Sequence, residues 1–196
     1  MSHFQGDACF WALTFAGKEV AAGCQNGLVY LFSSATFQLT HKLKGHSRGV
    51  RAIACLTDGK LVSGAPRALL ERDSEVIVWD LETRTLLKTI LLPPWWTMDL
   101  FALPGGKFLS LAKELTVWDQ AGNKVQIVRF GLMDLILSAC VLPDGTVATY
   151  GNCLKVWGLS TGECLKTVTM LAVTSMCVTG GKLVTGHADG CVREWE

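Results

Sequence analysis

Short runs in which every second residue is hydrophobic recur along the chain, and each ends at or next to an aromatic residue. Five such runs are recognisable, at 28–32, 76–80, 115–119, 154–158 and 191–195. Alternation of apolar and polar positions is typical of β-strands, whereas the apolar positions of a helix recur every three or four residues. The chain is therefore predicted to be all-β.

The aromatic residues that mark these runs are evenly spaced. Phe32, Trp79, Trp118, Trp157 and Trp195 are separated by 47, 39, 39 and 38 residues. A period of about forty residues is typical of repeat architectures, including solenoids of helix pairs, but the short alternating runs favour strands. We therefore predict five β-repeats, each anchored by one of these aromatic residues.

The last four repeats also carry a hairpin signal. It is Asp-Gly at 58–59 and 144–145, and Gly-Gly at 105–106 and 180–181. Glycine between two apolar runs supplies the positive φ that a tight turn needs, so two antiparallel strands are expected to flank each signal. A further run follows the aromatic residue in most repeats. Four strands per repeat is the composition of a β-propeller blade.

These repeats resemble those of the WD-repeat family, whose units carry Gly-His near the start and Trp-Asp at the end of the third strand. Gly-His at 45–46 and Trp-Asp at 79–80 supply both motifs in the second repeat, and Trp-Asp at 118–119 ends the third. The resemblance covers the whole chain and implies an all-β propeller of four-stranded antiparallel blades. Trp95-Trp96 and the segment 131–133 replace Gly-His in the next two repeats.

The resemblance also implies a buried hydrogen-bond network in the second blade. Its members would be His46, Ser63, Asp73 and Trp79, with Asp73 beyond a long loop between the second and third strands. A buried indole N–H and a buried imidazole both need partners, which agrees with this assignment. Blades without Gly-His are expected to depend on packing more than on such a network.

Counting strands gives four complete blades and three strands of a fifth, because the sequence stops directly after Trp195. The expected blades cover approximately 8–44, 49–92, 97–130, 134–170 and 173–196. A strand that would close the ring is not recognisable at either end. Three arrangements therefore stay open: part of a longer ring, a small irregular ring of five blades, and a partial ring completed by a partner chain.

Charge and hydropathy argue against two classes of partner. Lys and Arg number 18 against 17 for Asp and Glu, so the whole chain has no field that would attract nucleic acid. Charged residues interrupt every apolar stretch before the roughly 18 residues that span a bilayer, so no membrane insertion is expected. The first residues lack the pattern of a signal peptide, which favours a cytoplasmic or nuclear location.

Cysteines and histidines suggest neither a cofactor nor a catalytic centre. The eight cysteines are scattered without a Cys-x-x-Cys pair, so buried reduced thiols are expected and no metal site is predicted. The sequence contains no nucleophile elbow, phosphate-binding loop or His-Glu-x-x-His motif. His46 is assigned to the network, and His187 is expected to be a turn residue that caps its own loop. The chain is therefore predicted not to be an enzyme.

Candidate binding residues lie on the loops, because the strands of a propeller are committed to packing. In the segment 92–98 two prolines precede Trp95 and Trp96, which cannot both point into one core. Two interpretations stay open. At least one of the pair fills the space between blades, or the pair anchors a partner protein together with Met133 in the neighbouring loop.

Arginines supply the candidate polar contacts. Arg67 and Arg72 lie in the long loop 65–75, and Arg48 lies in the segment 44–49. Acidic residues in the long loop offset the positive charge of its arginines. The competing interpretation is therefore a solvated loop that binds no partner.

These observations predict a non-catalytic scaffold that binds a partner peptide or loop on the face carrying the inter-blade loops. Its partners would be other proteins, including a chain or segment that completes the propeller. The alternative is a scaffold associated with RNA or chromatin, whose arginine loops touch phosphate. A third, weaker hypothesis is an enzyme that acts at the channel mouth, which would need a metal or several converging carboxylates there.

Overall fold

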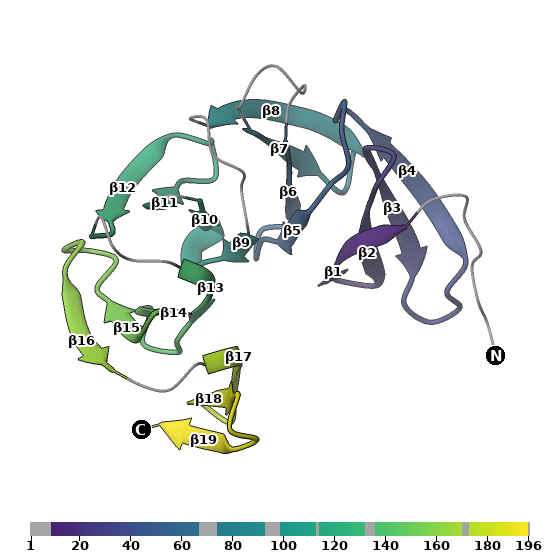
Figure 1. The fold of residues 1–196 in the computed structure, drawn as a ribbon. Helices are drawn as coiled ribbons and strands as arrows, with labels where there is room; N and C mark the ends of the chain where they lie inside the picture. The colour runs from purple at the N-terminus through teal and green to yellow at the C-terminus, as the bar shows by residue number, and fades with distance from the viewer. Residues whose placement is uncertain are drawn as a thin grey trace. The chain divides into compact units, whose positions relative to one another are not determined.

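A computed structural model describes residues 9–66, 74–92, 99–112, 114–131, 136–169 and 173–195. These residues form strands and turns, with one short 3-10 helix at Pro104–Gly106 (Figure 1). The predicted all-β class is confirmed. No helix within the described ranges is long and apolar enough to cross a membrane.

The strands form five separate sheets, each with its strands in chain order (Figure 1). Sheet 1 contains β1 (Phe10–Ala16), β2 (Glu19–Cys24), β3 (Leu28–Ser33) and β4 (Leu39–Lys44). Sheet 2 contains β5 (Ala52–Cys55), β6 (Lys60–Pro66), β7 (Ser74–Asp80) and β8 (Thr85–Leu92). Sheet 3 contains β9 (Asp99–Ala102), β10 (Phe108–Leu111), β11 (Glu114–Trp118) and β12 (Lys124–Arg129).

Sheet 4 contains β13 (Ile136–Val141), β14 (Val147–Gly151), β15 (Leu154–Trp157) and β16 (Cys164–Val168). Sheet 5 contains β17 (Val173–Thr179), β18 (Lys182–His187) and β19 (Val192–Trp195). Over the described residues the fold is thus four sheets of four antiparallel strands and one sheet of three. This is the strand pattern that the sequence predicted for four blades and part of a fifth.

The chain divides into two compact units. The first comprises Met1–Ala112 and Trp118–Asn123, and the second comprises Lys113–Val117 and Lys124–Glu196. Sheets 1 and 2 belong to the first unit and sheets 4 and 5 to the second, while sheet 3 contributes strands to both.

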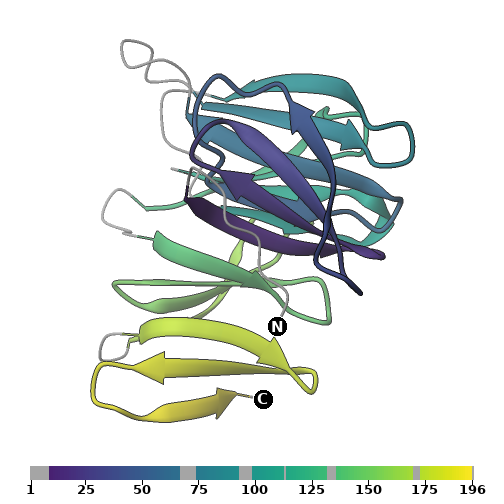
Figure 2. The same ribbon diagram turned by 90° about the vertical axis from the view of Figure 1, so that its right-hand side faces the viewer.

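In the first unit, sheet 2 is buried on both faces. One face packs against sheet 1 through a cluster that includes Ile53, Ile77 and Trp79. The other face packs against β9 and β10 through residues that include Val62 and Val78. Figures 1 and 2 show sheets 1 and 2 stacked face to face. Because both faces are covered, β6 and β7 are apolar along most of their length and do not alternate with polar residues.

In the second unit, sheets 4 and 5 pack in the same way. Ala148, Tyr150 and Leu154 of sheet 4 form one cluster with Val173 and Leu183 of sheet 5. The hydroxyl of Tyr150 donates to the carbonyl oxygen of Thr174 at 2.9 Å, so the buried ring keeps a polar partner.

The predicted hairpin turns are confirmed. Gly59, Gly145 and the glycine pairs at 105–106 and 180–181 all have positive φ and lie between the first and second strands of their sheets. Sheet 1 has the same turn at Gly17, with φ of 64°, where the sequence offered no Asp-Gly or Gly-Gly signal.

An ion pair joins sheets 1 and 2. Arg84 Nη1 donates to Glu19 Oε2 at 2.6 Å, and Thr40 Oγ1 donates to Glu19 Oε1 at 2.5 Å. Partial burial acts to raise the pKa of Glu19, but the two hydrogen bonds and the Arg84 charge outweigh it and hold that pKa below its usual value.

We expect the Glu19→Gln variant to lose a pH-dependent part of its stability. Because the folded pKa of Glu19 is lowered, its stabilising effect is complete above the ordinary glutamate pKa of about 4.3 and disappears as pH falls through the folded pKa. The variant should be less stable than the parent at pH 7, by no more than about 1 kcal/mol because the pair is partly exposed. Urea unfolding at neutral and acidic pH measures this. A deficit that stays constant into acid would contradict the assignment.

Candidate functional site

A chain of hydrogen bonds crosses the interior of sheet 2. Trp79 Nε1 donates to Ser63 Oγ at 2.7 Å, and His46 Nε2 lies 2.7 Å from the same oxygen. His46 Nδ1 lies 2.8 Å from Glu75 Oε1 on the other side of the ring. All four side chains are buried. Since Ser63 Oγ accepts from the indole, its own proton is available to His46 Nε2, which directs the Nδ1 proton toward Glu75.

The network contains a carboxylate that the family resemblance did not imply, that of Glu75. Asp73 lies outside the described residues, so its assignment stays a prediction. Glu75 was not predicted, although strand alternation offered a signal. Counting back from Trp79 in steps of two along β7 gives Ile77 and then Glu75, all on one face of the strand.

The indole-to-hydroxyl bond recurs in the other sheets that contain an anchor tryptophan. Nε1 donates to Oγ or Oγ1 at 2.8 Å from Trp118 to Ser110, from Trp157 to Thr149, and from Trp195 to Thr185. The expectation that blades without Gly-His depend mainly on packing was therefore incomplete. In each sheet the hydroxyl residue stands four positions after the last hairpin glycine, as Ser63 does after Gly59, which is a signal the sequence already contained.

Sheet 1 lacks this bond for a simple chemical reason. Ala22 occupies the position of the hydroxyl residue, because it pairs with Tyr30 as Ser63 pairs with Ile77, and Phe32 occupies that of the tryptophan. Phe32 instead belongs to an aromatic group in which Phe10 meets Tyr30 and Phe32 edge-on, with ring centroids 5.3 and 6.0 Å apart.

His187 does more than the turn role that the sequence suggested. It is buried at the end of β18, and its Nε2 lies 2.8 Å from Thr185 Oγ1, the oxygen that accepts from Trp195. Sheet 5 therefore contains a histidine, hydroxyl and tryptophan in contact, without a Gly-His motif.

The loop before β5 contains His46 and is held in place by the buried network of sheet 2. The same loop lies beside an exposed group of side chains. We call Trp11, Gln25, Arg48 and Arg51 the loop-end cluster. The loop is held to sheet 1 because Val50 N donates to Cys24 O at 2.9 Å. It is held to sheet 2 because Arg51 N donates to Gly64 O at 2.9 Å.

Trp11 and Arg51 form the centre of the loop-end cluster. The guanidinium carbon of Arg51 lies 4.6 Å from the ring centroid of Trp11, a cation–π contact. The register of β1 against β2 shifts at Trp11, so this side chain stands apart from the regular alternation of the strand. A Cβ atom on Gly49 would lie 2.4 Å from Trp11 Cζ3, so glycine is needed for the loop to approach the indole. The indole is thus held in place and is still 43% exposed.

Arg48 is the one predicted partner-binding residue that the structure describes; it is half-buried and directly precedes Gly49 in the loop that approaches Trp11. In the described part of the chain its guanidinium has no ion pair. The remaining predicted residues, Trp95, Trp96, Met133, Arg67 and Arg72, lie outside the described ranges. Sequence reasoning missed the meeting of Trp11 with Arg51, because nothing local links β1 to a loop forty residues later.

Titratable side chains in the described residues are dispersed. Within those ranges, no three of the His, Cys, Asp and Glu side chains gather in a way that could hold a metal ion. Asp99 begins β9, and burial raises the pKa of its carboxyl, with a hydrogen bond from its own neighbour Leu100 N acting in the opposite direction. Burial and the nearby Cys177 raise the pKa of the Cys140 thiol to about 11, which keeps it protonated at neutral pH.

Comparison with known proteins gives two sequence relatives and one family match. The family described as WD domain, G-beta repeat, matches residues 37–80. Autophagy-related protein 16 of Arabidopsis thaliana is 25% identical over 167 residues, and Set1 complex component swd1 of Schizosaccharomyces pombe is 30% identical over 87 residues. These alignments cover 80% and 43% of this chain. The chain spans only 32% and 20% of the length of these two relatives.

Two solved structures share the fold. The WD40 β-propeller domain of Doa1 aligns with a TM-score of 0.72 at 18% identity, covering 94% of this chain and 62% of that domain. The computationally designed Ika8 protein aligns with a TM-score of 0.73 at 25% identity, covering 95% of this chain and 57% of its own. The family match shows a WD repeat at residues 37–80, and with the repeated sheets the structural likenesses show that the chain has the fold of a WD40 β-propeller.

Proposed function

We propose that this protein is a non-enzymatic scaffold that binds a partner protein through the loop-end cluster. The observation that carries the proposal is the exposed Trp11, fixed from one side by Arg51 and from the other by the loop at Gly49. Tryptophan and arginine are the side chains most enriched among residues that dominate binding energy. An anchor that is already immobile loses little conformational entropy when a partner binds.

The chemistry of the cluster suggests the kind of segment it would bind. An apolar side chain would cover the exposed part of the Trp11 ring, and a carboxylate beside it would meet the guanidinium of Arg48. A peptide or loop that combines an aliphatic and an acidic residue meets both requirements. Trp95, Trp96, Met133, Arg67 and Arg72 remain proposed as further contacts on the same face of the propeller.

The sequence relatives support a role in assembly. Swd1 is named as a component of the Set1 complex, and a protein that works inside a complex needs binding surfaces more than a catalytic centre. A cytoplasmic or nuclear location is proposed on the same basis.

The test is selection of binding peptides from a displayed random library, followed by titration of the selected peptide into purified variants. We expect Trp11→Ala and Arg51→Ala each to weaken binding by about tenfold or more, and Arg48→Ala to weaken binding of acidic peptides selectively. Leu91→Ala serves as the matched control, because Leu91 is also exposed but lies on β8 away from the cluster.

Two results would count against this function. Selected peptides that bind the Trp11 and Arg51 variants as tightly as the parent would move the binding site elsewhere. Tight binding of single-stranded RNA that falls steeply with salt would instead support the nucleic-acid scaffold.

A further inference from the structure

The outer edge of sheet 2 is an eight-residue strand with little charge. β8 is the last strand in the order of sheet 2, and in the part of the chain that the structure describes it pairs with β7 alone (Figure 1). Lys88 is its only charged residue. Leu87 and Leu91 are 48% and 58% exposed. β8 therefore combines a free backbone edge with exposed apolar side chains, and such an edge can pair with a further strand.

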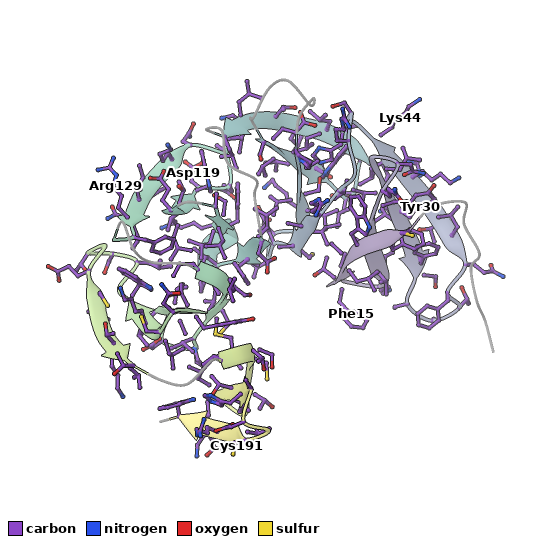
Figure 3. All side chains as sticks on the ribbon, in the orientation of Figure 1. Phe15, Tyr30, Lys44, Asp119, Arg129 and Cys191 are labelled. Atoms are coloured by element: carbon purple, nitrogen blue, oxygen red, sulfur yellow. The ribbon has the colours of Figure 1, made fainter. Side chains whose placement is uncertain are left out.

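The outer strands of the neighbouring sheets are different. β4 of sheet 1 carries Lys42 and Lys44, and β12 of sheet 3 carries Lys124 and Arg129. The side chains of Lys44 and Arg129 point outward from their strands (Figure 3). β16 of sheet 4 is only five residues long. Charged side chains and short length both keep an edge strand from pairing with another chain, and β8 has less of either.

The single charge of β8 is bound within the chain. Lys88 Nζ donates to Ala121 O at 2.7 Å and to Asn123 Oδ1 at 3.4 Å, both in the turn after β11. A Cβ atom on Gly122 would lie 3.0 Å from Lys88 Cδ, so the stem of the lysine also packs on this turn. The ammonium group is thus directed toward sheet 3 and does not guard the edge as Lys44 does.

The regular part of this edge is the segment 88–92. A bulge precedes it, because Val78 pairs with Lys88 but Trp79 pairs with Leu86. From 88 to 92 the register against β7 is uninterrupted. Ile90 is buried on the face toward sheet 3, whereas Leu91 is exposed on the opposite face. A strand added along this segment would cover Leu91 and continue the sheet.

We propose that β8 pairs with β8 of a second copy of the chain, antiparallel and about a two-fold axis at Ile90. This register uses the whole segment 88–92, with Thr89 opposite Leu91 and Lys88 opposite Leu92. No like charges then stand opposite each other, and the two copies of Leu91 become diagonal neighbours on one face. A second copy that offered β4 or β12 would bring several basic side chains to this edge, so β8 is the strand of this chain that fits it.

The arrangement is a closed dimer. Both chains contribute the same surface, so the pairing is isologous and stops at two copies. Sheet 2 of one copy and sheet 2 of the other become one continuous antiparallel sheet. The contact uses no residue of the loop-end cluster, so dimer formation and peptide binding can fail separately.

The experiment is sedimentation velocity over a wide range of protein concentration, without added peptide. The parent protein is expected to change from monomer to dimer as concentration rises. Thr89→Lys and Leu91→Glu each place two like charges diagonally across the dimer axis, so each should weaken dimerisation by about tenfold or more. Both side chains are exposed, so folding should survive, and thermal melting checks this. Thr167→Lys is the matched control, because Thr167 is exposed on β16 and pairs with β15 as Thr89 pairs with β7.

Mixing the two variants tests the register. In a mixed dimer the lysine of the Thr89→Lys chain stands opposite the glutamate of the Leu91→Glu chain, so the mixture should dimerise more tightly than either variant alone. A parent protein that stays monomeric at every concentration overturns the proposal. So does a Thr89→Lys variant that dimerises like the parent, a control variant that is weakened equally, or a mixture that gains nothing.

Discussion

Replacing Trp79 by alanine is expected to lower the free energy of unfolding by about 3–5 kcal/mol. The Trp79 side chain is 2% exposed in the cluster between sheets 1 and 2, so its removal leaves a large cavity that both sheets line. It also removes the donor that Ser63 accepts from. Urea denaturation followed by circular dichroism measures the loss.

Trp195→Ala is the matched control for this prediction. Trp195 makes the same bond, to Thr185 Oγ1, but its side chain is only partly buried in sheet 5. Its replacement should therefore cost clearly less than that of Trp79. Equal losses at the two positions would mean that the hydrogen bond, and not packing between sheets, dominates the contribution of these tryptophans.

The second large effect is expected from Ser63→Ala, which should lower the free energy of unfolding by about 2–4 kcal/mol. The substitution removes one small hydroxyl but leaves two buried polar atoms, Trp79 Nε1 and His46 Nε2, without their partner. An unsatisfied buried group costs about 1–3 kcal/mol, and both lie where water has little access.

Ser110→Ala tests this reasoning by comparison. Ser110 is buried to a similar degree, and its oxygen accepts from Trp118 Nε1. Its alanine variant removes the hydroxyl that accepts from Trp118 Nε1, and no histidine contacts this hydroxyl among the described residues, so the expected loss is about half that of Ser63→Ala. If Ser110→Ala proved as costly as Ser63→Ala, the imidazole contact would contribute nothing measurable to the network.

The repeated strands could be predicted because each sheet repeats the same short apolar runs and turns at a regular spacing in the sequence. The spacing of Phe32, Trp79 and the later tryptophans reports one aromatic residue per sheet, and the glycine turns report the hairpins between them. The hydroxyl partners were also encoded, at a fixed distance after each turn. They were missed because the Gly-His motif was taken as the sign of a network.

The division into two compact units and the loop-end cluster could not be predicted in the same way. The meeting of Trp11 with Arg51 depends on a register shift in β1 and on a glycine that lets a loop approach the indole. Neither the register shift nor this glycine recurs at a regular spacing in the sequence, and neither Trp11 nor Arg51 belongs to a recognisable motif. Contacts of this kind arise from the packing of one sheet on the next. The local pattern of a single sequence does not indicate how sheets pack.

The indole-to-hydroxyl bonds and the loop-end cluster have complementary roles in this account. Bonds such as that of Trp79 hold each sheet rigid from within, and the network that includes His46 fixes the loop that carries Arg48 and Arg51. Rigid sheets can therefore present exposed side chains in a fixed arrangement, which is what a scaffold needs for selective binding.

The most direct test of the account is fluorine NMR of the protein with 5-fluorotryptophan at its seven tryptophans, titrated with a selected binding peptide. The Trp11→Phe variant assigns the resonance of Trp11. We predict that saturation with peptide shifts the Trp11 resonance and leaves those of the buried Trp79, Trp118 and Trp157 in place. A peptide that binds to saturation while the Trp11 resonance stays unchanged would contradict the central claim that partners bind at the loop-end cluster.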